Sequence, residues 1–209
     1  MSTEKRHSHR IRLLAAARRL LREGDYGNIT ARELVAASDT NLGSIGYHFG
    51  SKEALLNEAI GLALEEWVEK IGVATRAAGS DGIAALMTRS LSAVLDEYEA
   101  IRPYYLAYIA ALARSAHSPD LREQLTAHYE RQRTRVAQWI DEALDGRLAP
   151  ENARHMASLM IATADGMLIQ KFIEESTTPI SSELVGAATL AFAARSPTAK
   201  ATPKRHPSA

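Results

Sequence analysis

The chain has 209 residues, of which 46% are hydrophobic and 24% are charged, and its formal net charge at pH 7 is zero. This composition is ordinary for a globular protein, and the length suits one sizeable domain or a small domain joined to a larger one. The absence of cysteine excludes disulfide bonds and thiolate metal sites. No uninterrupted apolar run approaches the ~18 residues of a membrane span, so we expect a soluble cytoplasmic protein with no membrane partner.

The charges are unevenly distributed along the chain. Residues 1–52 carry a net charge of +4, residues 53–195 carry −7, and residues 196–209 carry +3. A basic N-terminal segment joined to an acidic remainder is typical of a DNA-binding module attached to a domain that does not bind DNA. Chance clustering of charges is the alternative explanation.

The N-terminal region predicts two helices in succession. Apolar residues at helical spacing indicate a helix over about 8–23. The next helix, 30–38, begins at a capping box, because Thr30 is followed three residues later by Glu33. The start of this second helix is therefore specified by local hydrogen bonds.

A very short turn separates this helix from the following one. Residues 39–41, Asp-Thr-Asn, favour turns and caps, so a further short helix is predicted at 42–49. Gly50 ends it, and Ser51 caps a long helix that runs to about residue 77. Two short helices joined this tightly predict a helix-turn-helix.

The segment from about residue 8 to 64 resembles the DNA-binding segment of the TetR family of bacterial transcriptional regulators. The positions that carry the resemblance are Gly24, Tyr26, Gly43, Ile45, Tyr47, His48, Phe49, Ser51, Lys52, Glu53 and Leu55. Gly46 departs from the family pattern, because many members have an aromatic residue there. The resemblance implies a homodimer that binds a palindromic operator in double-stranded DNA, usually as a repressor, and releases it when a small-molecule effector binds.

Some residues of this segment are expected to bind DNA phosphates by resemblance, namely Thr30, Tyr47, His48 and Lys52. Thr30 also has a structural role as a helix cap, and a helix N-terminus attracts phosphate through its free amides. Packing between helices is the alternative for Tyr47 and His48. A solvated lysine is the alternative for Lys52, whose place in the first turn of a helix is unfavourable without an anion nearby.

Base recognition is expected from the outer surface of the second short helix, lined by Asn41, Leu42, Ser44 and Gly46. Arg32 occupies a position that approaches the groove edge in the family, and an arginine there can bind guanine through two hydrogen bonds. Only Asn41 among the other four can make such a bidentate contact. We therefore expect DNA shape, water and thymine methyl groups to carry much of the specificity.

The remainder of the chain also has helical periodicity, without the alternation of a sheet. After a break at 79–82 a helix extends to about Tyr98, and prolines at the expected first positions then start helices near 103–115, 119–145, 150–175 and 179–195. The predicted fold is all-α with about nine helices. Its expected parts are a helix-turn-helix head at 1–52, a connecting helix at 52–77, a ligand-binding and dimerisation domain at 78–195, and a disordered basic tail at 196–209.

Two sets of candidate residues lie in the larger domain. Large aromatic and flexible side chains predict a small-molecule pocket, with plain core packing as the alternative: Met87, Leu91, Tyr98, Tyr105, Tyr108, Tyr129, Trp139, Met156 and Met160. Small and apolar residues at helical spacing predict a dimer interface on the last two helices, again with intramolecular core as the alternative: Ala157, Ile161, Ala164, Leu168, Phe172, Leu184, Ala188, Ala191 and Phe192.

Two other classes of function compete with a DNA-binding regulator. The sequence contains no convincing set of catalytic residues, phosphate loop or metal-ligand spacing, so we expect no enzyme activity, no cofactor and no metal. The second rival is a helical interaction protein that has lost specific DNA binding or antagonises related regulators. The basic head, with Arg32 and Lys52 in place, argues against this rival.

Overall fold

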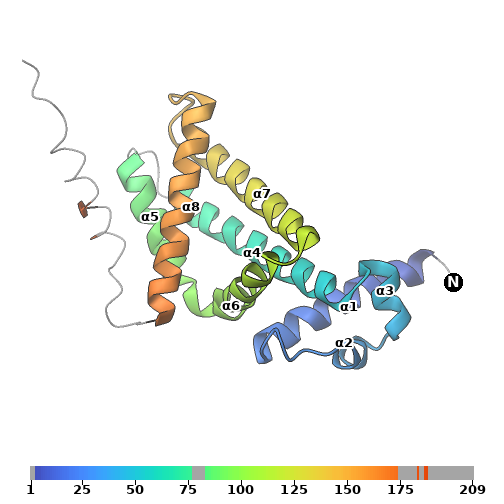
Figure 1. Ribbon diagram of the computed structural model, residues 1–209. Helices are drawn as coiled ribbons and strands as arrows, with labels where there is room; N and C mark the ends of the chain where they lie inside the picture. The colour runs from blue at the N-terminus through green and yellow to red at the C-terminus, as the bar shows by residue number, and fades with distance from the viewer. Residues whose placement is uncertain (1–2, 77–82, 174–182, 184–185, 188–209) are drawn as a thin grey trace, which may run out of the picture.

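The computed structural model describes residues 3–76 and 83–173, together with positions 183, 186 and 187. All regular elements in this part of the chain are α-helices (Figure 1): α1 Thr3–Glu23, α2 Ala31–Ser38, α3 Leu42–Phe49, α4 Lys52–Arg76, α5 Ile83–Asp96, α6 Tyr98–Ser115, α7 Pro119–Ala143 and α8 Pro150–Ile173. The predicted all-α fold is confirmed. The ninth predicted helix falls on residues of which only 183, 186 and 187 are described, and the predicted tail lies outside the described residues.

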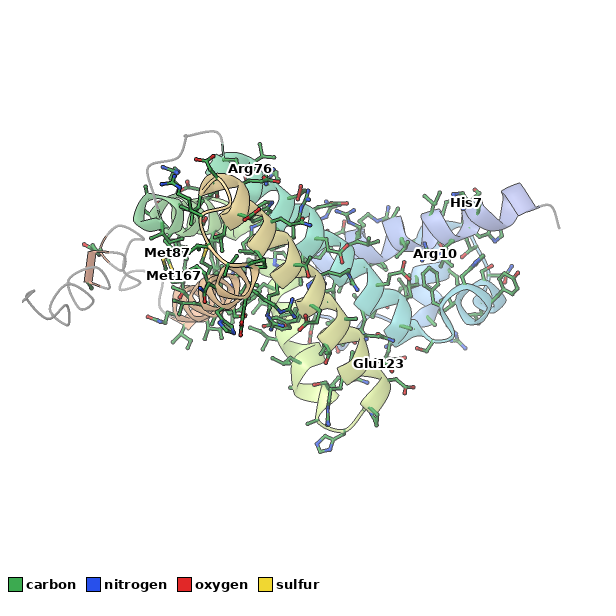
Figure 2. The ribbon with its side chains drawn as sticks, turned by 90° about the horizontal axis from the view of Figure 1, so that it is seen from above. His7, Arg10, Arg76, Met87, Glu123 and Met167 are labelled. Atoms are coloured by element: carbon green, nitrogen blue, oxygen red, sulfur yellow. The ribbon has the colours of Figure 1, made fainter. Side chains whose placement is uncertain are left out.

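The helices form two groups along α4 (Figure 1). The head consists of α1, α2 and α3 at one end, and the body consists of α5 to α8 around the rest of α4. Helix α4 packs against α1 and α3 as well as against α5, α6 and α7. Figure 2 shows Arg10 of α1 and Arg76, the last residue of α4, far apart along the molecule. Helix α4 therefore joins the two groups physically.

One apolar cluster continues from the head into the body. It contains Leu34 and Ile45 of the helix-turn-helix, Leu56 of α4 and Leu168 of α8. Leu34, Leu56 and Leu168 are fully buried, and burying such a side chain stabilises a fold by about 1.5–3 kcal/mol. A second cluster fills the space between α5, α7 and α8 around Ile140. Head and body are thus connected by a shared core as well as by α4.

Two predicted helix starts were wrong. Helix α1 begins at Thr3, before the predicted residue 8, and α6 begins at Tyr98, before Pro103. Only Glu97 separates α5 from α6, and the Ile101 amide already donates to the Glu97 carbonyl over 3.2 Å. Pro103 lies in the second turn, where it removes one helical hydrogen bond. The other two described prolines of this kind do begin α7 and α8 as predicted.

Helix α8 is apolar around most of its circumference. By length and composition alone it qualifies as a candidate membrane span, which corrects the expectation that no such segment exists. A single candidate of this kind is weak support for a membrane segment, because core helices of soluble proteins pass the same test. Helix α8 packs along α7 and against α5, and it leaves large apolar side chains exposed on another side, namely Leu159, Ile169, Phe172 and Ile173.

Candidate nucleic-acid interface and internal cavity

The N-terminus of α2 is held by a complete capping box. The Thr30 amide donates to Glu33 Oε2 over 2.7 Å, and the Glu33 amide donates to Thr30 Oγ1 over 3.2 Å. The Thr30 hydroxyl also donates to Glu33 Oε2 over 2.8 Å. These hydrogen bonds from Thr30 lower the pKa of Glu33, which keeps its carboxylate charged. Because the Thr30 hydroxyl proton is engaged, the free amides of the first turn are the donors that this helix end leaves for an anion.

The N-terminus of α3 is capped by Asn41. Its Oδ1 accepts from the Ser44 amide over 3.0 Å and from the Ser44 hydroxyl over 3.3 Å. Both lone pairs of this oxygen are then used, so Asn41 cannot make a bidentate contact with a base while it caps α3. The side-chain amide nitrogen of Asn41 remains available as a donor.

The outer surface of α3 differs from the expected one at Ser44. Leu42 and Tyr47 are 54% and 67% exposed, and Gly46 is also exposed. Ser44, however, is buried against α1, where its hydroxyl lies 3.1 Å from Nδ1 of the buried His9. The prediction of Ser44 as a base-facing residue was therefore wrong, because α3 turns this side of its first turn towards α1.

Cationic side chains of the head differ in how far they are neutralised. Arg10 pairs with Glu58 and lies 5.3 Å over the Phe49 ring, and Arg12 pairs with Asp39 over 3.0 Å. Arg32 is exposed and forms no ion pair with another described residue. Its charge is therefore the most available in the helix-turn-helix for contact with DNA.

Lys52 has a structural contact that its sequence position did not indicate. Its Nζ donates to the Ile29 carbonyl over 2.8 Å and lies 3.5 Å from Glu53 Oε1. The side chain thereby ties the first turn of α4 to the residue that precedes Thr30. An ammonium has three donors, so the contact with Ile29 and an expected phosphate contact are compatible.

Arg18 of α1 is held by both α4 and α6. Its guanidinium donates to both carboxylate oxygens of Glu66, with an Nη1–Oε1 distance of 2.7 Å, and this bonding lowers the pKa of Glu66. The Tyr104 hydroxyl donates to the Arg18 carbonyl over 3.1 Å. The residues that follow Glu66 and Tyr104 in the chain, Trp67 and Tyr105, line a cavity in the body. On both α4 and α6, a residue that contacts Arg18 of the head is therefore followed directly by a residue that lines the cavity.

This cavity lies between α4, α5, α6, α7 and α8 and has a volume of about 70 Å³. That is room for roughly five water molecules or a small organic ligand of similar size. Six of the predicted pocket residues line it: Leu91, Tyr105, Tyr108, Tyr129, Trp139 and Met160. Tyr108 and His128 also border an open groove of about 580 Å³ at the junction with the head.

Three predicted pocket residues lie elsewhere. Met87 packs against the cluster that contains Met167, and Figure 2 shows these two side chains close together. Tyr98 is buried in the main core at the start of α6, with Lys171 Nζ 5.1 Å over its ring. Met156 packs between α7 and α8, one turn before the cavity. Helical spacing indicated that all three side chains face the protein interior. It did not indicate which apolar cluster each of them joins.

A half-buried carboxylate that the sequence did not reveal, Asp165, lies in the cavity wall. Tyr129 donates to Asp165 Oδ2 over 2.7 Å, and Tyr105 donates to Asp165 Oδ1 over 3.3 Å and to its carbonyl over 3.2 Å. Burial raises the pKa of Asp165, and these two tyrosines partly oppose the effect. The sequence did contain one signal for this site, a single acidic residue within an apolar stretch of α8. A carboxylate among apolar residues needs hydrogen-bond partners, so it indicates a polar site inside the body.

Other polar groups of the wall have no hydrogen-bond partner. They are Trp67 Nε1, the Tyr108 hydroxyl, both ring nitrogens of His128, and Trp139 Nε1. A buried group left in this state costs about 1–3 kcal/mol. Burial also lowers the pKa of His128, even though Glu65 Oε1 lies 3.7 Å from its Nδ1. Tyr108 approaches Tyr129, but the geometry between the two hydroxyls is not that of a hydrogen bond.

Gly72 provides the space for one wall of the cavity. A Cβ atom at this position of α4 would overlap the Trp139 ring. Arg76, one turn further along α4, lies 5.4 Å over the same ring. The absence of a side chain at Gly72 thus fixes where the Trp139 indole packs.

The predicted dimer face of α8 is largely internal. Ala157 and Leu168 are fully buried in the chain's own core, and Ile161 and Ala164 line the cavity, so these four residues are not available to a partner. Phe172 is 44% exposed. The remaining predicted positions, Leu184, Ala188, Ala191 and Phe192, lie outside the described residues. The exposed apolar stripe of α8 is a different one, formed by Leu159, Ile169 and Ile173.

Comparison with known proteins identifies two matching family models. Residues 13–59 match the bacterial regulatory proteins of the tetR family, and residues 83–196 match the C-terminal domain of BetI-type transcriptional repressors. The second match alone covers more than half of the chain.

Individual relatives agree with these matches. The HTH-type transcriptional regulator BetI of Burkholderia thailandensis is 25% identical over 166 residues, which cover 79% of this chain and 82% of the relative. A Rhodococcus sp. RHA1 protein has the same fold with a TM-score of 0.68, 18% identity and coverage of 88% and 94% of the two chains. A Saccharomonospora viridis protein solved in complex with choline has a TM-score of 0.56, 21% identity and coverage of 93% and 98%. The chain belongs to the TetR family of bacterial transcriptional regulators.

Proposed function

We propose that the protein is a homodimeric repressor that binds a palindromic operator through the head and releases it when a small organic cation occupies the body cavity. Its site of action is the cytoplasm. The observation that carries the effector proposal is the carboxylate of Asp165, half-buried in a cavity wall that includes five tryptophan and tyrosine side chains. The proposal for the head rests on the exposed surface of α3 and on the exposed Arg32 of α2.

The proposed DNA contacts divide into two kinds. Arg32 and the exposed side chains of α3, Leu42 and Tyr47, are proposed to face base edges and the sugar-phosphate walls of the major groove. His48, Lys52 and the amides at the start of α2 are proposed to bind phosphates. Asn41 contributes through its side-chain amide nitrogen, because its oxygen caps α3. The proposed domain division, with a head at 1–52 and a body at 78–195, assigns these contacts to the head alone.

The preference for a cation follows from the chemistry of the cavity. An organic cation is attracted to the faces of aromatic rings, and quaternary ammonium groups are bound in this way by aromatic cages. Five aromatic residues line the cavity: Trp67, Tyr105, Tyr108, Tyr129 and Trp139. A cation also offsets the cost of keeping the half-buried carboxylate of Asp165 ionised, since partial burial raises its pKa. The choline complex of the Saccharomonospora viridis protein supports the proposal by showing that a fold of this kind accommodates such a ligand.

The proposed dimer interface includes the exposed stripe of α8. Leu159, Gly166, Ile169 and Ile173 recur at helical spacing, and a Cβ atom at Gly166 would meet nothing within 4 Å. The open space at Gly166 allows a helix of a second copy to approach closely. We expect Ile169→Asp to shift the protein to monomer in analytical ultracentrifugation, while Gln170→Asp, at the neighbouring exposed position, remains dimeric. A dimeric Ile169→Asp protein would contradict this choice of face.

Selection of binding sequences from random duplex DNA tests the proposed repressor function. We expect an inverted repeat, consistent with a two-fold symmetric dimer. Arg32→Ala is expected to relax the preference at one base pair of each half-site, whereas Arg19→Ala, also exposed but on α1, leaves it unchanged. Lys52→Ala is expected to weaken binding to all sequences and to reduce the salt slope by about 1. Failure to enrich any sequence would favour the interaction-protein alternative.

Release by ligand is tested separately with the selected operator. Titration with small quaternary ammonium ions is expected to lower operator affinity by about 5–150-fold, the usual range of allosteric coupling. Asp165→Asn should abolish this response and keep operator binding in the absence of ligand. If neutral compounds released the operator at the same concentrations as cations, this result would contradict the proposed effector class.

A further inference from the structure

His9 of α1 is a buried titratable residue that contacts the helix proposed to enter the major groove. Its side chain belongs to a residue only 8% exposed, although Ser8 and Arg10 on either side of it are not buried. Nδ1 of His9 lies 3.1 Å from the hydroxyl oxygen of Ser44, which is 7% exposed in the first turn of α3. A buried histidine of α1 therefore holds α3 at the end where that helix begins.

The hydrogen bonds around Ser44 have only one consistent direction. The Ser44 amide can only donate, so the side-chain atom of Asn41 that lies 3.0 Å from it is the oxygen and not the nitrogen. The same oxygen lies 3.3 Å from the Ser44 hydroxyl, which therefore donates its proton to it. The Ser44 oxygen then accepts from His9, so Nδ1 of His9 carries a proton. These three residues form one directed hydrogen-bond network, the His9–Ser44–Asn41 network.

The network determines which atom of the Asn41 side chain is left for a partner. The oxygen is held against the first turn of α3, and the side-chain nitrogen of this exposed residue is directed elsewhere. In the major groove, guanine, adenine and thymine each present an acceptor to such a donor, whereas cytosine presents a donor. The orientation of the Asn41 amide therefore disfavours cytosine at a base that it contacts.

We infer that His9 is a positioning residue for base recognition, which acts through Ser44 to hold the Asn41 amide in the orientation that disfavours cytosine. His9 does not itself reach DNA, because it is buried between α1 and α3. Buried polar groups that are fully bonded to one another are held rigidly. Without the His9 donor, the Ser44 hydroxyl is released from α1, and the rotation of the Asn41 amide is less restricted. This inference rests on the proposed function, because it concerns a base contact proposed for the head.

The readout is the base preference at the position that Asn41 contacts. Selection with the full-length protein gives the operator, and Asn41→Ala then identifies the base pair of each half-site whose preference depends on Asn41. Duplexes with each of the four bases at that pair are titrated by fluorescence anisotropy. The parent protein should bind the cytosine duplex at least about fivefold more weakly than the preferred one, which is the usual effect of one hydrogen bond.

Variants of His9 separate its Nδ1 donor from its volume. His9→Leu removes the donor and should reduce the discrimination against cytosine at least about threefold. His9→Asn places an amide donor near the position of Nδ1 and should restore the discrimination, whereas His9→Gln places its donor near Nε2 and should not. Ser44→Ala breaks the network by removing one oxygen atom and should resemble His9→Leu. His7→Leu changes an exposed histidine of the same helix and should leave the discrimination unchanged.

A purely structural role of His9 would give a different pattern. Relaxed preference at the Asn41 base pair alone, with the other pairs of the half-site unchanged, supports the inference. Equal weakening for all four bases, or relaxed preference at every pair, means that His9 only stabilises the packing of α3 and overturns the inference. Circular dichroism and thermal denaturation show whether each variant is folded. If His9→Leu does not fold, Ser44→Ala and the pair His9→Asn and His9→Gln decide the question.

The remaining outcomes separate the inference from the proposed function. Equal discrimination in His9→Asn and His9→Gln overturns the assigned role of Nδ1. A parental base preference in Asn41→Ala overturns the inference but leaves an operator-binding repressor intact. Failure of the parent protein to enrich any sequence overturns both the proposed function and the inference.

Discussion

The helix ends of the head and the wall of the body cavity differ in how completely their polar groups are hydrogen-bonded. At the helix-turn-helix, Thr30 and Asn41 are engaged in caps, and Lys52 is bonded to a backbone carbonyl. In the cavity, Trp139 and Tyr108 have no partner. The head is therefore fixed in shape before DNA binds, which limits the ordering cost of association. The body retains hydrogen-bonding capacity that a ligand can use. This contrast predicts different consequences for removing polar groups from the two regions.

The largest effect is expected from the core of the head. Leu34→Ala removes a fully buried side chain of α2 and should lower the free energy of unfolding by about 2–5 kcal/mol. Leu42→Ala is the matched control, because Leu42 is 54% exposed on α3 and its loss should change stability by less than about 0.5 kcal/mol. Chemical denaturation measures both. A tolerant Leu34→Ala protein would show that the head does not depend on a packed core.

The next effect concerns the cap of α3. Asn41→Ala removes the acceptor for the Ser44 amide and should cost about 0.5–2 kcal/mol of stability. Asn41→Asp keeps a capping oxygen but removes the side-chain N–H₂ donor, so it should retain stability and weaken DNA binding. Thermal denaturation and a DNA titration of both variants separate the two roles. Equal DNA affinity for parent and Asn41→Asp would remove this residue from the proposed interface.

The same contrast explains which parts of the site were predictable. Thr30 and Asn41 were identified as caps from sequence, because a cap depends on residues three positions apart. The burial of Ser44 and the contact of Lys52 with Ile29 were not identified, because both depend on how helices pack against each other. The helix-turn-helix was therefore predicted well in its local structure and less well in the direction of its side chains.

In the body, the spacing of apolar residues predicted where helices occur but not which side of each helix faces the core. Helix α8 is apolar nearly all round, so its core-facing stripe through Ala157 and Leu168 was mistaken for the dimer face. Pro103 was interpreted as a helix start, although the chain tolerates it in the second turn of α6. Six pocket residues were predicted because large aromatic side chains gather at the cavity. Asp165 was missed because single polar residues carry no periodic signal.

A hydrogen bond between the two regions gives the third prediction. Tyr104→Phe removes the donor to the Arg18 carbonyl and should cost about 0.5–1.5 kcal/mol of stability. Because the neighbouring Tyr105 lines the cavity, we also expect the effector to lower operator affinity less in this variant than in the parent protein. The variant should still bind the effector alone, and the operator alone, with parental affinity. Operator titrations with and without saturating ligand measure this coupling. Full coupling in Tyr104→Phe would show that α4 alone connects cavity and head.

A smaller effect should appear in the dependence of stability on pH. Burial lowers the pKa of His128 in the folded protein, so the unfolded chain binds the proton more readily. The contribution of His128 to stability is then complete above its unfolded pKa of about 6.5 and is lost as pH falls below that value. His128→Phe should flatten this part of the profile in urea denaturation at a series of pH values. His155→Phe, which changes an exposed histidine of α8, is the control and should leave the slope unchanged.

The smallest effect, and the sharpest test of the contrast, is expected from Tyr108→Phe. The Tyr108 hydroxyl is buried without a partner, so its removal should leave stability unchanged or slightly increased, in contrast to Thr30→Val in the capping box, which should cost about 1 kcal/mol. Differential scanning calorimetry without ligand measures both variants. A clear loss of stability in Tyr108→Phe would mean that the hydroxyl has a partner in solution, such as an ordered water. The Tyr108 hydroxyl would then no longer be one of the unpartnered groups by which the cavity wall differs from the capped helix ends of the head.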